Sequence, residues 1–168
     1  MSKKRKNSPR RKRSAKKLRD IHRSNLQFLL DLKGATGILH NLIHDNLALM
    51  AVAQFKTRHP ELTCVYTNAG HSGIDIKGWT KDRKIGLVAE VKTTLPNAEG
   101  DLMGPQLKQI KKDLDRLKKW NSDLRYLVLL AASTESAVRS QLKIASNYKG
   151  IEIINAFHQK LTQPEEVD

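Results

Sequence analysis

The chain has 168 residues, enough for one domain with a substantial core but few for two. Its net charge of +14 favours a polyanionic partner, and its single cysteine, Cys64, excludes an intrachain disulfide or a thiolate metal cluster. No apolar run approaches the ~20 residues that span a bilayer, and the N-terminus lacks the apolar core of a signal peptide. We therefore expect a cytoplasmic protein, or a nuclear one in a eukaryote, with no membrane contact.

The N-terminal segment is strongly basic. Residues 1–23 contain twelve of the 31 Lys and Arg residues against one acid, Asp20, so this segment carries +11 of the net charge. Residues 1–17 have too few apolar side chains to fold alone, which predicts a disordered arm that contacts nucleic-acid phosphates, or else serves as a nuclear-import signal or a solubilising tail. The predicted phosphate contacts are Lys3, Lys4, Arg5, Lys6, Arg10, Arg11, Lys12 and Arg13.

A single domain is predicted for residues 18–160, followed by a polar tail at residues 161–168. Apolar residues recur at helical spacing from Leu18 to Leu32. A second helix is expected from Ile38 to His59, and because it is apolar on most sides it should be central. Three consecutive strands should then form a meander, at Leu62–Thr67, Gly73–Trp79 and Ile85–Lys92.

The second half of the chain alternates helices and strands. Pro105 begins a helix, because proline is tolerated at the first helical position. A strand with a continuous apolar run is predicted at residues 125–131, a helix capped by Ser133 at residues 134–148, and a last strand at residues 151–157. This order predicts an α/β fold, a mixed β-sheet core with helices on both faces.

Besides Lys77, three charged residues interrupt the second and third strands, namely Asp75, Glu90 and Lys92. A turn centred on Asp82-Arg83 pairs residues whose numbers add up to 165, so Asp75 should face Glu90. Directly opposed side chains have Cβ atoms about 4.5–5.5 Å apart, and like charges there are destabilising, so we expect a positive charge between them. Strand alternation puts Lys92 on the face of Glu90, and it points Ile74, Ile76, Ala89 and Val91 toward a core.

Two carboxylates that meet in this way suit Mg²⁺, which binds through one or two carboxylates, water and substrate phosphate. Mn²⁺ is an alternative ion, and the backbone carbonyl of Val91 is a further candidate ligand. Lys92 could orient or deprotonate an attacking water, or neutralise charge that develops on a phosphate. These residue types therefore predict metal-assisted hydrolysis of a phosphodiester.

The segments GIDIKG and GLVAEVK, at residues 73–78 and 86–92, resemble the PD-(D/E)xK nuclease superfamily. The core motif of that superfamily is an Asp on one strand and a Glu-x-Lys on the next, which match Asp75, Glu90 and Lys92. The order of elements over residues 38–157 is also similar. The resemblance implies a restriction-endonuclease-like fold, these three residues as the catalytic set, and Mg²⁺-dependent DNA cleavage that leaves a 5′-phosphate, most like a small type II restriction endonuclease.

Double-stranded DNA is the expected partner, with no small-molecule cofactor, and a homodimer would supply one site for each strand. A Holliday-junction resolvase or DNA-repair nuclease is one alternative, and a nucleic-acid-binding protein without turnover is another. A salt-bridged trio in which Asp75 and Glu90 share Lys92 is the structural alternative for the three charges. Asp45 is expected near the polar face of the hairpin, and further candidate DNA contacts are His71, Ser72, Lys77, Gln106 and Lys108.

Overall fold

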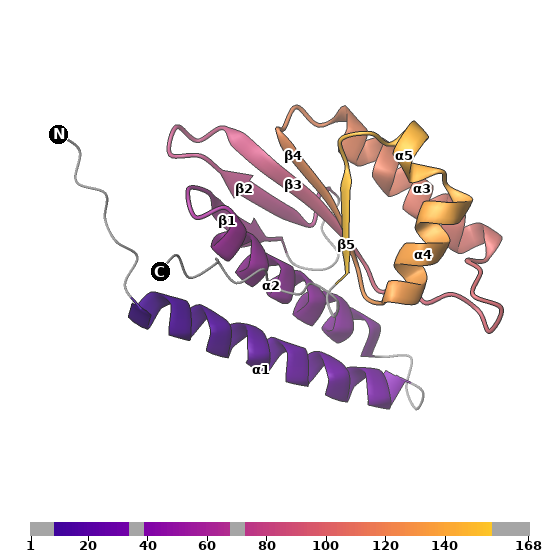
Figure 1. Ribbon diagram of the computed structural model, residues 1–168, viewed down its shortest axis with the longest axis horizontal. Coiled ribbons are helices and arrows are strands. Elements are labelled where there is room, and N and C mark those ends of the chain that lie inside the picture. The colour runs from indigo at the N-terminus through magenta and orange to yellow at the C-terminus, as the bar shows by residue number, and fades with distance from the viewer. Residues whose placement is uncertain (1–8, 34–38, 68–72, 156–168) are drawn as a thin grey trace, which may run out of the picture.

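A computed structural model of the chain describes residues 9–33, 39–67 and 73–155 (Figure 1). No described helix is long and apolar enough to cross a membrane. The elements are α1 (Pro9–Lys33), α2 (His40–Arg58), β1 (Thr63–Tyr66), β2 (Ile76–Trp79), β3 (Ile85–Lys92), α3 (Gly104–Lys119), β4 (Leu124–Leu129), α4 (Ala132–Gln141), α5 (Ile144–Asn147) and β5 (Glu152–Asn155).

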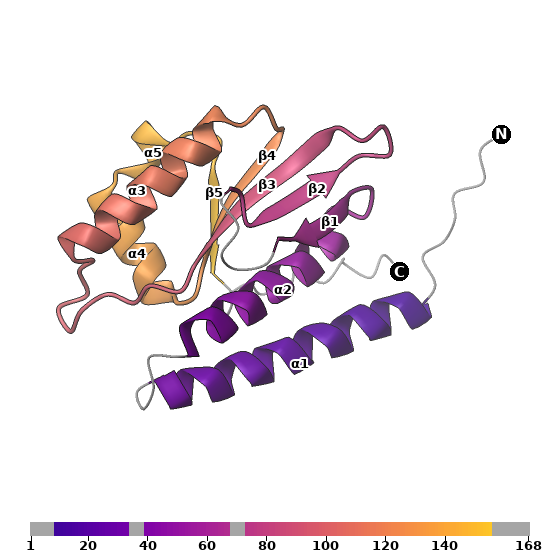
Figure 2. The same cartoon turned by 180° about the vertical axis from the view of Figure 1, so that it is seen from behind.

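The five strands form one mixed sheet in the order β1-β2-β3-β4-β5. The meander β1-β2-β3 is antiparallel, whereas β3, β4 and β5 are parallel to one another. Helix α2 covers one face, with α1 antiparallel to it on the side away from the sheet, and α3 and α4 cover the other face (Figures 1 and 2). The predicted mixed α/β architecture with helices on both faces is confirmed.

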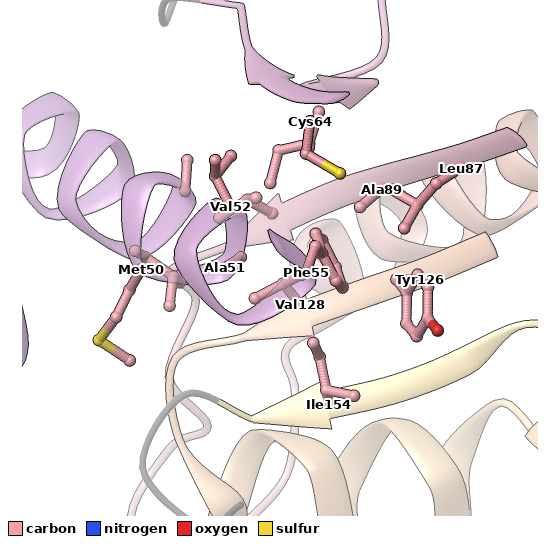
Figure 3. Close-up of a cluster of buried hydrophobic side chains, with 14 of the residues drawn as sticks. Met50, Ala51, Val52, Phe55, Cys64, Leu87, Ala89, Tyr126, Val128 and Ile154 are labelled. Atoms are coloured by element: carbon pink, nitrogen blue, oxygen red, sulfur yellow. The ribbon is translucent and has the colours of Figure 1, made fainter. Parts of the chain in front are cut away.

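The core between α2 and the sheet explains why this helix is apolar on most sides. Figure 3 shows Phe55 of α2 among side chains of several strands, with Ala89 on β3 and Tyr126 on β4. Leu26 of α1 is fully buried in the same cluster. The central helix is therefore packed between the sheet and α1, as the sequence pattern predicts.

A second core fills the opposite face of the sheet. Three leucine or isoleucine side chains of α3, namely Ile110, Leu114 and Leu117, are fully buried there. They pack with Val88 of β3 and Leu127 of β4. The face of β3 that carries Glu90 is consequently covered by a helix.

Two local predictions are wrong. Residues 9–17 are helical and not a disordered arm, because Lys and Arg are good helix formers and Pro9 occupies the first helical position, where its missing N–H costs little. The helix predicted over residues 134–148 is broken: Lys143 has a φ of 48°, a left-handed conformation that ends α4 before α5 begins. Ser133 lies inside α4 and does not cap it.

Candidate active site

The β2-β3 hairpin has the predicted register at the end that carries the charged residues. The pairs are Ile76 with Ala89, Lys77 with Val88 and Gly78 with Leu87, so their numbers add up to 165 as predicted. A bulge between Gly78 and Trp79 shifts the pairing only next to the turn. The position opposite Glu90 therefore belongs to Asp75, one residue before β2 begins.

Asp75 itself ends the antiparallel ladder. The N–H of Val91 donates to Asp75 Oδ2 at 2.8 Å, although the register would place the backbone of Ile74 there. The carboxylate takes the position of a backbone acceptor, and the pairing of β2 with β3 begins only at Ile76. Ile74 packs on the α3 face with Val88, and its predicted position beside Ile76 is wrong.

Glu90 is buried beneath α3, with 1% of its surface exposed. Its Oε1 accepts a hydrogen bond from Arg116 Nη1 at 2.8 Å, and the same nitrogen donates to the Gly73 carbonyl at 2.8 Å. Arg116 Nη2 also lies 3.2 Å from Asp113 Oδ1. Arg116 thus connects α3 to both parts of the hairpin that carry the candidate acids.

Lys92 has a different partner from the one predicted. Its Nζ lies 2.9 Å from Oδ2 of Asp113, an α3 side chain that is 1% exposed. Gln109 Nε2 donates to the same oxygen at 3.2 Å. The salt-bridged trio in which Asp75 and Glu90 share Lys92 is therefore not the observed ion pairing: Lys92 pairs with Asp113, and Arg116 pairs with Glu90.

Asp75 also contacts α2 on the opposite face of the sheet. His44 Nε2 lies 3.6 Å from Asp75 Oδ2, and His44 Nδ1 lies 3.3 Å from the Tyr66 hydroxyl, which in turn donates to Asp45. The α2 residue that reaches Asp75 is therefore His44 and not its neighbour Asp45, which was the predicted one. The site lies beside the start of β2, where α2 and α3 approach the same strand end from opposite faces of the sheet.

The two candidate acids have opposite pKa shifts. Burial raises the pKa of Glu90 to about 8, helped by the negative charges of Asp75 and Asp113, although Arg116 and Lys92 oppose the shift. Burial also raises the pKa of Asp75, but the contact with His44 and the Val91 N–H outweigh it, so that pKa lies below its ordinary value. Two neighbouring carboxyls whose pKa values shift in opposite directions hold one proton between them at neutral pH.

The donor set fits a magnesium ion. Among the described residues, no three His, Cys, Asp or Glu side chains group closely enough to form a metal site by themselves. Mg²⁺ does not require such a cage, because it keeps several waters and also binds substrate phosphate. The N–H and C=O of a strand residue point to the same neighbour, so the Val91 carbonyl lies on the side of Asp75. Two carboxyl groups and one carbonyl are available there.

The other predicted DNA contacts are dispersed. Lys77 Nζ lies 5.3 Å from the centroid of the Trp120 ring, and Gln106 caps α3 by accepting from the Met103 N–H at 2.9 Å. Lys108 is exposed on α3. Residues 3–6, with Lys3, Lys4, Arg5 and Lys6, lie outside the described residues, as do His71 and Ser72, and the side chains of residues 10–13 are also outside them.

An open groove of about 790 Å³ runs along α3, and all of its lining residues belong to this helix. Gln109 and Arg116 line it together with Lys108, Lys111, Lys112 and Lys119.

Comparisons of the chain with protein-family models, curated proteins and solved structures give no match.

On α2, sequence reasoning missed the contact of His44 with Asp75, and on α3 it missed three site residues, Gln109, Asp113 and Arg116. They recur every three or four residues, which is the spacing of one helix face, beside the apolar stripe of Ile110 and Leu114. A polar stripe next to a buried one, on the helix that follows the Glu-x-Lys strand, is the signal that could have identified them.

Proposed function

We propose that the chain is a Mg²⁺-dependent endodeoxyribonuclease of the PD-(D/E)xK type, with Asp75, Glu90 and Lys92 as its catalytic residues. The observation that carries the proposal is the approach of Asp75 to Glu90 at the end of the hairpin, with one pKa lowered and the other raised to about 8. A buried pair with this unbalanced charge is expected where a cation binds. The basic charge of the chain supports a phosphodiester substrate.

Each residue has a role in the proposed reaction. Asp75, held ionised by His44 and the Val91 N–H, would be the first ligand for Mg²⁺. Glu90 would ligate after releasing its proton. Lys92, placed by Asp113, would orient the attacking water or neutralise charge on the phosphate. The chemistry that the ion supplies when bound is polarisation of the phosphoryl oxygen and a lower pKa for a coordinated water.

A non-catalytic nucleic-acid-binding protein is the second candidate, and the ion pairs favour it. Arg116 already donates a hydrogen bond to Glu90, and Asp113 already holds Lys92. If these pairs persist when DNA binds, they serve only to fasten α3 to the sheet. The assay for cleavage decides between the two candidates.

Purified full-length protein is expected to cut DNA in the presence of Mg²⁺ or Mn²⁺ and to be inactive in EDTA. Discrete plasmid fragments would support a type II restriction enzyme, which is the form we propose first. Cutting confined to a four-way junction would support a resolvase. Binding of plasmid and junction without cleavage, in both metals, would contradict the nuclease and leave the second candidate.

The basic start of α1 is proposed to contact DNA phosphates. Changing Arg10, Arg11, Lys12 and Arg13 to Gln keeps good helix formers and removes four charges. Each lost phosphate contact should reduce the slope of log affinity against log salt by about 0.9. Fluorescence anisotropy of a short DNA duplex, recorded in Ca²⁺, measures that slope. The salt concentration is varied from about 50 to about 200 mM.

A control variant removes three positive charges elsewhere, those of Lys81, Arg83 and Lys84, which are exposed in the hairpin turn. This variant should retain more of the salt dependence than the α1 variant. If the α1 variant keeps the wild-type slope, residues 10–13 do not contact phosphate.

A further inference from the structure

Exposed apolar side chains concentrate on the helical hairpin of α1 and α2. The described residues include eight large hydrophobic side chains that are exposed, and five of them lie on these two helices. The five are Ile21, Phe28, Leu32, Leu42 and Leu49, of which Phe28 is the most exposed at 62%. Contiguous exposed apolar surface on a soluble domain marks an interaction site.

The two helices present these residues at the same spacing. On α1 the positions are Ile21, Asn25, Phe28 and Leu32, and on α2 they are Leu42, Asn46, Leu49 and Ala53. Both rows step by four, three and four residues, the alternation of the a and d positions in a coiled coil. Each row has an asparagine at its second position, and neither contains a charged residue.

Both rows lie on the same side of the hairpin, where Ile21, Phe28, Leu32, Leu42 and Leu49 are exposed. Asn46 is partly buried there, and Ala53, at the end of the α2 row, is 7% exposed. Ala48, Val52 and Phe55 of α2 pack toward the sheet, and the helical period of about 100° per residue leaves the side of Ile43 and Leu47 for α1. Leu42 and Leu49 then lie on the remaining side of α2, which faces neither the sheet nor α1. Because α1 is antiparallel to α2 (Figure 1), the same rotation brings its own row to that side.

We propose that a second copy of this chain covers this face, so that two α1–α2 hairpins form a four-helix bundle about a twofold axis. A twofold interface is self-complementary, and two uncharged rows of equal heptad spacing satisfy that requirement. A single asparagine in a heptad row selects the register and the number of helices, which is expected for a helical partner of matching pattern. An uncharged face is also where copies carrying +14 each repel least.

The bundle deepens the proposed function and rests on it in one respect: a dimer would supply one nuclease site for each DNA strand. The interface itself does not require nuclease activity. The basic residues 10–17 precede the row that begins at Ile21, so they remain free for DNA.

Sedimentation velocity of the full chain, without DNA or Mg²⁺, tests the bundle. At tens of micromolar the wild type should have twice the chain mass of 19.0 kDa. The double variant Phe28→Glu, Leu49→Glu should be monomeric, with an unchanged circular dichroism spectrum because both side chains are exposed. The matched control Val65→Glu, Leu95→Glu replaces side chains of 47% and 39% exposure elsewhere and should stay dimeric.

Replacing the asparagines gives a second test, because a nonspecific hydrophobic surface has no heptad register for them to select. Asn25→Leu with Asn46→Leu should raise the melting temperature of the assembly and allow species larger than a dimer. A monomeric wild type, or a dimer that survives the Phe28 and Leu49 changes, overturns the proposal. A dimeric wild type that does not cleave DNA would support the bundle and refute the proposed function, whereas cleavage by a monomeric wild type would refute the bundle alone.

Discussion

Replacing Glu90 with Gln is expected to lower Mg²⁺-dependent DNA cleavage by at least about 100-fold, the usual scale for loss of one electrostatic contributor to a transition state. Gln has nearly the same shape but cannot become an anion, so it cannot ligate a cation as a carboxylate does. Asp75→Asn and Lys92→Met should have losses of the same order. Asp75→Asn removes the carboxylate whose pKa is lowered, and Lys92→Met removes the ammonium beside Asp113.

The fold should survive the two amide substitutions. Glu90 holds a proton at neutral pH, so Gln resembles the form already present, and its oxygen can still accept from Arg116. The Asn oxygen at position 75 can still accept from the Val91 N–H. Lys92→Met should cost some stability, because it leaves the buried Asp113 with fewer positive neighbours.

Single-turnover cleavage rates and thermal melting of each variant are the relevant measurements. Glu152→Gln is a matched control, since Glu152 is an exposed acid paired with Arg58 at 2.7 Å on β5 and lies outside the site. It should cleave at the wild-type rate. Near-wild-type cleavage by any variant at positions 75, 90 or 92 would remove that residue from the catalytic set.

The stability of the metal-free protein is expected to fall as the pH rises through the pKa of Glu90. Folding raises this pKa from 4.5 to about 8, so the folded state binds the proton more tightly than the unfolded state. The stabilising effect of the proton is complete below pH 4.5 and is lost as the pH rises through about 8. Asp75 contributes in the opposite sense, but only at acid pH, because its pKa is lowered.

Glu90→Gln isolates this effect, because the amide does not titrate. Relative to that variant, the wild type should lose a few kcal/mol in its free energy of unfolding between about pH 5 and pH 9, at 1.4 kcal/mol for each unit of pKa shift. Urea unfolding in EDTA at both pH values measures the difference. A difference that does not change with pH would show that Glu90 titrates normally.

Magnesium provides the complementary measurement. Above pH 8 the ion no longer competes with the proton on Glu90, so Mg²⁺ should stabilise the wild type against urea more at pH 9 than at pH 6. The Glu90→Gln and Asp75→Asn proteins should gain much less. Equal stabilisation of all three proteins would place the ion elsewhere.

The hairpin register could be predicted because it depends on neighbours in the chain. The turn at Asp82-Arg83 and the alternation of apolar residues along β3 are local, and together they place Asp75 opposite Glu90. Helical spacing likewise predicted α2 and α3. At residues 9–17 the high charge predicts disorder, whereas the helix propensity of Lys and Arg favours the helix that the structure contains.

The electrostatic partners could not be predicted in this way. Arg116 meets Glu90 across 26 residues, and His44 meets Asp75 across 31, because α3 and α2 pack on opposite faces of the same strand end. The sequence by itself determined which acids face each other, since pairing within a hairpin follows from its turn. Only the tertiary structure decided which of them keeps its proton and which cation each one holds, because burial and distance between helices and sheet set those energies.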